Sequence, residues 1–173
     1  MSRRPVDQLN AGQSFYARQL PDMDVAHFGA LWHLFTLGHL VATDLDSIAR
    51  VMDCSFADLD LLGTLAIDEE QSMRATDLAA TLYLSNAVVS LRVRRLVKQG
   101  LIARAHQPDD RRAFALRLTA QGRALIGRAL PLIAREAKIV RFFAHMSPTD
   151  RGHLVRILGD LHQRYDREFV THP

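Results

Sequence analysis

Basic side chains gather in one short segment of this 173-residue chain. Between positions 92 and 123 stand nine arginine or lysine residues and two aspartates, a net charge of +7. The whole chain carries +3, so the remaining positions carry −4. Arginine and lysine bind phosphate groups through charge-assisted hydrogen bonds, and clustered positive charge is the pattern expected of a surface that contacts a polyanion. Charge alone leaves open the alternative of a solvated basic face without a partner.

A helix predicted from Ser85 to Gln99 could present part of this charge. Ser85 is a favourable N-cap residue, and Gly100 is well placed to end the helix. Apolar residues recur at helical spacing on one side, at Leu84, Val88, Val89, Val93 and Leu96. The residues that we predict to contact DNA lie on the other side of the helix. Short side chains stand at its N-terminal end and cations further along: Ser85, Asn86, Ala87, Ser90, Leu91, Arg94, Arg95 and Lys98. Short side chains permit a close approach to a major groove, and long cations reach bases or phosphates.

A polar tip between two short apolar stretches follows this helix. Segments 101–105 and 113–118 predict two strands, which makes the tip the turn of a hairpin. Asp110 and Arg112 stand two residues apart in that tip, where the carboxylate can brace one guanidinium. Arg111 or Arg112 is then free to enter a minor groove, which attracts arginine when it is narrow. The alternative is a solvated turn with a surface salt bridge.

The surrounding elements that must position these residues are predicted to be helical. Apolar spacing predicts helices over 6–20, 24–52, 56–67, 77–82 with Thr76 as N-cap, from Thr119 towards Phe143, and from Ser147 onwards. Two short helices followed by a hairpin are the arrangement of a winged helix-turn-helix. The predicted fold class is therefore mainly α with a small β-hairpin.

This order of elements predicts three segments with different tasks. Residues 1–55 form N-terminal helices for dimerisation and a ligand pocket, 56–120 the winged helix-turn-helix that binds DNA, and 121–173 the C-terminal dimerisation helices. The apolar helices at both ends are too numerous to pack on so small a core, so we expect a homodimer.

Arg92 is the exceptional residue of the predicted DNA-reading helix. It falls between Val88 and Leu96 on the face that the helix should bury, and an unpaired buried guanidinium is costly. Asp60, set among leucines on the helix that should pack nearby, is the expected partner. Two interpretations stay open, an ion pair without a ligand or a polar floor for an anionic or planar ligand.

Other residue types that could carry chemistry give weaker patterns. Cys54 lacks a strongly basic setting, so we expect it to be inert. His27, His33 and His39 recur every six residues and thus rotate around a helix, which does not suit a metal site. The chain contains no G-x-S-x-G, P-loop, G-x-G-x-x-G or H-E-x-x-H motif, so we expect neither an enzyme nor a metal or other cofactor.

Composition indicates a cytoplasmic protein. The chain has one cysteine, which excludes an internal disulfide framework and fits a reducing compartment. No apolar run approaches the roughly 20 residues of a membrane span, and no apolar stretch follows Arg3 and Arg4 as in a signal peptide.

Three runs around the hairpin carry a family resemblance. They are Gly100-Leu101-Ile102-Ala103-Arg104, Pro108-Asp109-Asp110-Arg111-Arg112 and Leu116-Arg117-Leu118-Thr119-Ala120-Gln121-Gly122. They resemble the G-L-I-x-R, D-x-R and L-T-x-x-G patterns of the MarR (multiple antibiotic resistance regulator) family. Gln107 departs from the pattern, since members commonly carry an acid before the proline.

The resemblance implies a function and roles for particular residues. Ser85 to Lys98 would be the recognition helix, and Arg112 the wing arginine braced by Asp110. Members are homodimers that bind pseudo-palindromic operators on double-stranded DNA, usually as repressors until a small ligand binds. The urate-responsive branch is similar in having an extra N-terminal helix with a ligand-contacting Trp, which Tyr16 replaces here, and Asp60 and Arg92 match its other two ligand residues.

We therefore expect a ligand-responsive, DNA-binding transcription regulator. Its effector would be a small aromatic or purine-like anion. The alternative is a winged-helix module for protein–protein interaction without a specific DNA target. The charge on both the helix and the hairpin argues against that alternative, because protein contacts do not need it.

Overall fold

The structure is a computed structural model that describes residues 5–68, 73–107 and 110–171. Within these ranges, residues 5–7, 106–113 and 169–171 are described by their backbone. The chain divides into two compact units, Met1–Ala57 and Asp58–Pro173.

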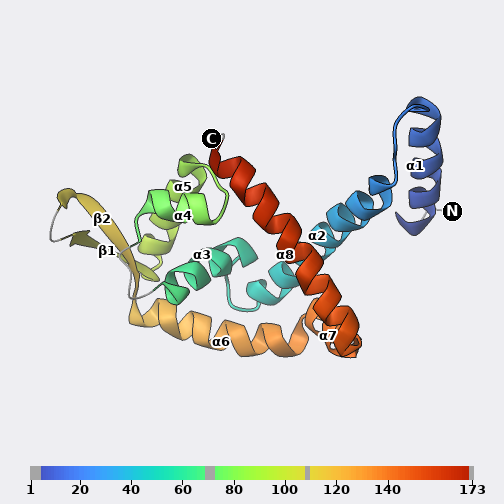
Figure 1. Ribbon diagram of the computed structural model, residues 1–173. Coiled ribbons are helices and arrows are strands. Elements are labelled where there is room, and N and C mark those ends of the chain that lie inside the picture. Colours follow the sequence, from blue (N-terminus) through green and yellow to red (C-terminus); the bar gives the residue numbers. More distant parts are fainter. Residues whose placement is uncertain (1–4, 69–72, 108–109, 172–173) are drawn as a thin grey trace. The chain divides into compact units, whose positions relative to one another are not determined.

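The first unit contains helices α1 (Pro5–Gln19) and α2 (His27–Arg50), with α1 folded back beside the start of α2 (Figure 1). Aromatic rings join the two helices, with 4.7 Å between the ring centroids of Tyr16 and Phe28. The helix α2 begins three residues later than the sequence predicted. Asp24 Oδ1 accepts a hydrogen bond from the Ala26 N–H at 2.8 Å and so holds the chain in a turn before the helix.

The second unit contains α3 (Phe56–Ile67) from Asp58 onwards, together with the elements that follow it. These are α4 (Ala75–Thr81), α5 (Asn86–Lys98), β1 (Ile102–Gln107), β2 (Asp110–Leu118), α6 (Ala120–Glu136), α7 (Lys138–His145) and α8 (Pro148–Thr171). Its core is apolar and draws on α3, α4, α5 and the hairpin: Leu59, Leu61, Leu62, Leu65, Leu78, Val89, Val93, Leu96, Ile102 and Leu116. The predicted winged helix-turn-helix fold is confirmed.

The helix α4 starts differently from the prediction. It begins at Ala75, and Thr76 lies inside its first turn instead of capping it. Asp77 Oδ2 accepts a hydrogen bond from the Arg74 N–H at 2.8 Å, so the carboxylate in the first turn satisfies an amide that the helix leaves free.

The base of the hairpin is fastened by the residues of the L-T-x-x-G run. Thr119 Oγ1 donates to the Gly100 carbonyl oxygen at 2.6 Å and accepts from the Gly122 N–H at 3.0 Å, which caps α6. A Cβ on Gly122 would collide with the carbonyl oxygen of Leu101, so only glycine permits this close approach. Gly100, with φ of 72°, turns the chain from α5 into β1.

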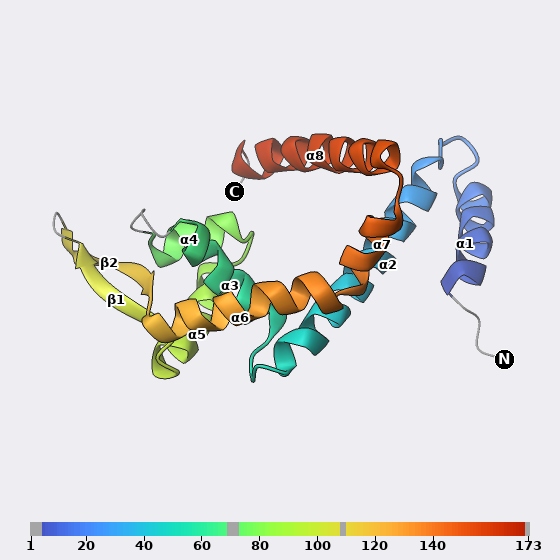
Figure 2. The same ribbon diagram turned by 90° about the horizontal axis from the view of Figure 1, so that it is seen from below.

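The long helix predicted from Thr119 towards Phe143 is two helices. Ala137 breaks it with an extended ψ of 125° and is fully buried, so α6 ends at Glu136 and α7 starts at Lys138. The helix α6 leads away from the hairpin, and α8 returns so that its C-terminal end lies beside the turn between α4 and α5 (Figures 1 and 2).

Candidate nucleic-acid interface

The helix α5 begins with the N-cap that the sequence predicted. Ser85 adopts an extended backbone, and its Oγ accepts a hydrogen bond from the Val88 N–H at 3.4 Å. One side of α5 is buried in the core through Val89, Val93 and Leu96. That burial fixes the rotation of the helix about its axis and so decides which side chains face outwards.

The opposite side of α5 presents the residues predicted to contact DNA. The exposed ones are Ser85, Asn86, Ala87, Ser90, Leu91, Arg94, Arg95 and Lys98. Leu91 is 64% exposed, which is unusual for a leucine and leaves an apolar contact available beside Arg94. The prediction was wrong for Val88, which is 39% exposed and belongs to this outer face.

An ion pair joins α5 to the core. A terminal guanidinium nitrogen of Arg95 donates to Oδ1 of Asp58 on α3, and the Asp58 side chain is 5% exposed against 53% for Arg95. A buried carboxylate requires a charged or hydrogen-bonding partner. Arg95 therefore has a structural role that sequence reasoning missed, besides its place on the outer face.

Asp60 does not have the buried position that the sequence predicted. Its side chain is exposed, and no ion pair joins it to Arg92 in the described part of the chain. Arg92 itself is half-buried. The core face of α3 passes through Asp58, Leu61, Leu62 and Leu65, at spacings of three and four residues, whereas Asp60 falls outside that row. This spacing is the signal that could have selected Asp58.

The predicted hairpin is present as an antiparallel pair. Ile102 faces Leu118 and Ala105 faces Ala115, with an irregularity between His106 and Gln107. The Leu116 N–H also donates to the Met73 carbonyl oxygen at 2.8 Å, which ties the segment before α4 to the hairpin.

The residues predicted for the hairpin tip lie at the start of β2. Asp110, Arg111 and Arg112 are placed there by their backbone, and Gln107 pairs with Asp110. Their side chains lie outside the described part of the structure, so the brace between Asp110 and Arg112 stays a prediction.

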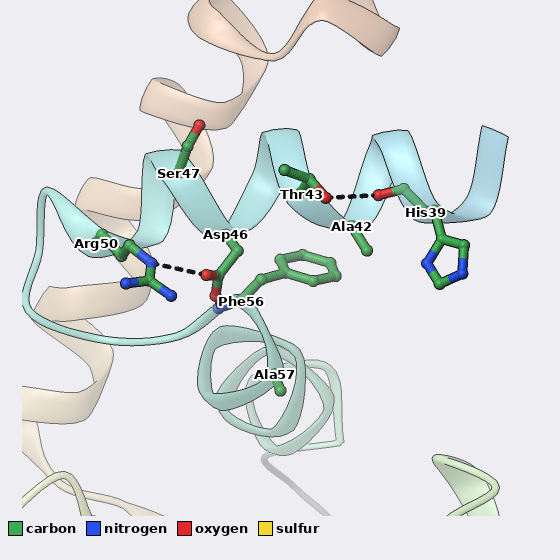
Figure 3. Close-up of a pocket in the computed structure, with 8 residues that line it drawn as sticks. All are labelled: His39, Ala42, Thr43, Asp46, Ser47, Arg50, Phe56 and Ala57. Atoms are coloured by element: carbon green, nitrogen blue, oxygen red, sulfur yellow. Dashed lines mark hydrogen bonds and ion pairs between the residues drawn. The ribbon is translucent and has the colours of Figure 1, made fainter. Parts of the chain in front are cut away.

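A polar pocket of about 640 Å³ lies in the first unit along the second half of α2 (Figure 3). Its centre is Asp46, whose carboxylate accepts from the Phe56 N–H at 3.0 Å and from Arg50 Nε at 2.8 Å. The backbone bond from Phe56 holds the pKa of Asp46 below its ordinary value, and Arg50 adds to the effect. Since Phe56 starts α3, Asp46 caps the next helix across the turn.

A second pocket of the first unit, of about 370 Å³, is mostly aromatic and apolar. Tyr16, which the sequence marked as a ligand residue, lines it together with Phe28, Trp32 and Phe35. The ring centroids of Phe28 and Trp32 lie 5.9 Å apart. Such a wall suits a flat apolar or aromatic molecule.

Two further features concern the described residues only. None of the helices found there has both the length and the apolar content of a membrane span. No group of three histidine, cysteine or acidic side chains among them could hold a metal ion.

Comparisons with known proteins give related regulators. Over 152 residues the chain is 28% identical to the HTH-type transcriptional regulator PecS of Dickeya dadantii, covering 83% of this chain and 86% of PecS. It is 26% identical over 96 residues to the HTH-type transcriptional repressor YetL of Bacillus subtilis, which is 56% of either chain. The S. aureus MepR–DNA complex matches the fold with a TM-score of 0.69 at 20% identity, covering 76% of this chain and 96% of MepR.

Two short helices, the second with a cationic outer face, and a hairpin fastened to its end define a winged helix-turn-helix protein. The MarR family model matches residues 65–114, from the end of α3 to the hairpin. Over this segment, which is less than half of its length, the chain is similar to the MarR family.

Proposed function

We propose that the chain is a DNA-binding transcription regulator that acts as a homodimeric, ligand-responsive repressor on a pseudo-palindromic operator. The observation that carries the proposal is the outer face of α5, where Arg94 and Lys98 follow small residues at the N-terminal end. The names of the related regulators support it. We also infer that the protein acts in the cytoplasm and has no enzymatic activity.

Exposed apolar side chains support a homodimer. The helices α2 and α8 each leave large apolar residues uncovered in the single chain, which are Leu31, Leu34, Phe35, Leu37 and Leu40 on α2 and Val155, Ile157, Leu158, Leu161 and Tyr165 on α8. Contiguous apolar surface on a soluble chain marks an interaction site. A second copy would bring two recognition helices to two operator half-sites.

We also propose a small aromatic or purine-like anion as the effector, with Tyr16, Asp60 and Arg92 as candidate ligand residues. The aromatic pocket beside Tyr16 supports a flat ligand. Arg92→Ala should abolish release from DNA by the effector and leave DNA binding itself largely intact. An unchanged effector response in that variant would refute the role of Arg92.

The function is tested by fluorescence anisotropy. The protein is titrated against the duplex upstream of its own gene and against a scrambled duplex, at several salt concentrations. A specific regulator should bind the upstream duplex about 10³-fold more tightly, with affinity that falls steeply as salt rises. Binding to neither duplex at low salt would favour the alternative, a protein–protein interaction module.

A pair of arginine variants sharpens this test. Arg94→Ala should weaken specific binding by about 10-fold, because one base or phosphate contact is lost. Arg156→Ala is the matched control, since Arg156 lies exposed on α8 and pairs with Asp160 at 3.4 Å. Equal affinities for the two variants would contradict the assignment of the outer face of α5.

A further inference from the structure

The turn between α4 and α5 contains a tyrosine where glycine is the usual residue. The Leu84 N–H donates to the Ala79 carbonyl oxygen at 2.9 Å, and the Tyr83 N–H donates to the Ala80 carbonyl oxygen at 3.2 Å. This pair of bonds is the Schellman end of a helix, and its left-handed position favours glycine. Tyr83 occupies that position with φ of 52°, which is unfavourable for a bulky side chain.

Burial does not account for the tyrosine, because Tyr83 is 54% exposed. Its side chain instead reaches α8. The hydroxyl donates to Asp166 Oδ1 at 2.7 Å and lies 3.3 Å from His162 Nε2. The rings of Tyr83 and His162 meet edge to face, with 6.1 Å between their centroids.

The three side chains form one connected group. His162 and Asp166 stand four residues apart and therefore on the same face of α8. Since the Tyr83 hydroxyl donates to Asp166, its oxygen can accept a hydrogen bond from His162 Nε2–H. The same bond to Asp166 raises the pKa of the Tyr83 phenol, and desolvation and the negative charge of the carboxylate act in the same direction.

The helix α8 also has an uncovered apolar face. Val155, Leu158 and Leu161 are exposed one to three turns before Asp166 along the chain. A contact between this helix and the turn that leads into α5 joins the surface for self-association to the DNA-reading helix.

We infer that Tyr83 is a positioning residue whose hydroxyl fastens the α4–α5 turn to α8 and so fixes the recognition helix relative to the dimerisation surface. The inference rests on the proposed function. It explains why a strained position carries tyrosine, since glycine would relieve the backbone and lose the connection. The connection should affect DNA binding only when two recognition helices must match two half-sites at a set spacing.

The test compares Tyr83→Phe, Asp166→Ala and the double variant with the wild type. Phenylalanine retains the ring and removes the hydroxyl. Asp160→Ala is the matched control on α8, because Asp160 is an exposed aspartate that pairs with Arg156. Anisotropy measures affinity for the full operator, for a single half-site, and for operators with one or two base pairs added between the half-sites.

The inference predicts a specific pattern. Tyr83→Phe and Asp166→Ala should each weaken full-operator binding by about three- to ten-fold, as expected for loss of one solvent-exposed hydrogen bond of ordinary net strength. Both should leave half-site binding unchanged and reduce the discrimination against altered spacing. The double variant should be no weaker than either single one, because both changes remove the same contact.

An absorbance titration of the phenols checks the contact independently of DNA. The chain has three tyrosines, so the loss of one high-pKa phenol is measurable. Asp166→Ala should lower the pKa of Tyr83, whereas Asp160→Ala should not.

The outcomes separate the two claims. If the wild type binds no operator, the proposed function fails and the inference with it. If the wild type binds and Tyr83→Phe binds equally tightly with the same spacing preference, the inference alone fails. Additive effects of the two single variants, or equal losses on full operator and half-site, would also overturn it.

Discussion

The middle of the chain buries its apolar side chains, whereas the C-terminal helices leave theirs exposed. From α3 to β2, leucines, valines and Ile102 are buried in a core of their own. The described side chains of α7 and α8 include none that is buried, although they carry Phe142, Leu158 and Leu161. The first region is therefore stable through its own contacts, and the second presents a surface that a second copy would complete.

The largest effect on stability should come from a cavity in the core of the middle region. Leu62 is fully buried on α3, so Leu62→Ala should lower the free energy of unfolding by about 2–5 kcal/mol, measured by urea denaturation. Ile67→Ala on the same helix is the control, because Ile67 is exposed, and its cost should be within about 0.5 kcal/mol. Similar costs for both would remove the distinction between core and surface.

A charge on α8 should act on assembly. Leu158→Glu would place a carboxylate in the proposed interface twice, once from each copy. The dimer dissociation constant should rise by about 10²-fold or more, measured by sedimentation equilibrium. Gln163→Glu introduces the same charge on an exposed part of α8 and should change assembly little. A Leu158→Glu protein that remains fully dimeric would show that α8 lies outside the interface.

The ion pair inside the middle region should have a smaller effect. Asp58→Ala leaves a gap in the core and frees Arg95, and it should cost about 1–3 kcal/mol of stability by urea denaturation. The cost is moderate because Arg95 is half exposed to solvent, which screens the ion pair. Asp60→Ala should change stability by no more than about 0.5 kcal/mol, since Asp60 is exposed on the same helix. If Asp60→Ala cost more stability than Asp58→Ala, Asp60 and not Asp58 would be the carboxylate that stabilises the fold.

The smallest effect concerns the connection from α2 to α3. The pKa of Asp46 is lowered by the Phe56 N–H and by Arg50, so its ionised form stabilises the fold. Asp46→Asn should lower the melting temperature at pH 6–7. The difference from wild type should begin to shrink as pH falls below about 4, where the carboxyl of the unfolded chain becomes protonated, and disappear once pH falls below the lowered pKa of Asp46 in the folded state. Asp22→Asn in the α1–α2 loop, which also removes a carboxylate but keeps the contacts of Asp46 with Phe56 and Arg50, serves as the control.

Local patterns in the sequence were sufficient for the fold class. The apolar spacing of α5, the N-cap Ser85 and the glycine after α5 depend on neighbours within a few residues. The same holds for the hairpin, whose strands are separated by a short polar turn. These features were predicted correctly, and the outer face of α5 followed from them with one error, at Val88.

Contacts between distant positions were not accessible in this way. Periodicity places an acid on a helix, but the packing of α3 against α5 selected Asp58 over Asp60 and gave it Arg95 as a partner. The helix break at Ala137 likewise depends on the burial of that residue in the tertiary structure, which no local sequence pattern predicts.

The sequence by itself determined the elements, their order and the concentration of positive charge on the helix and hairpin, because each depends on short-range spacing. Only the tertiary structure decided which charges are bound internally and which face outwards. It also brought Tyr83 to Asp166, from a turn and a helix 83 residues apart, because helix docking sets such contacts and leaves no local trace in the sequence.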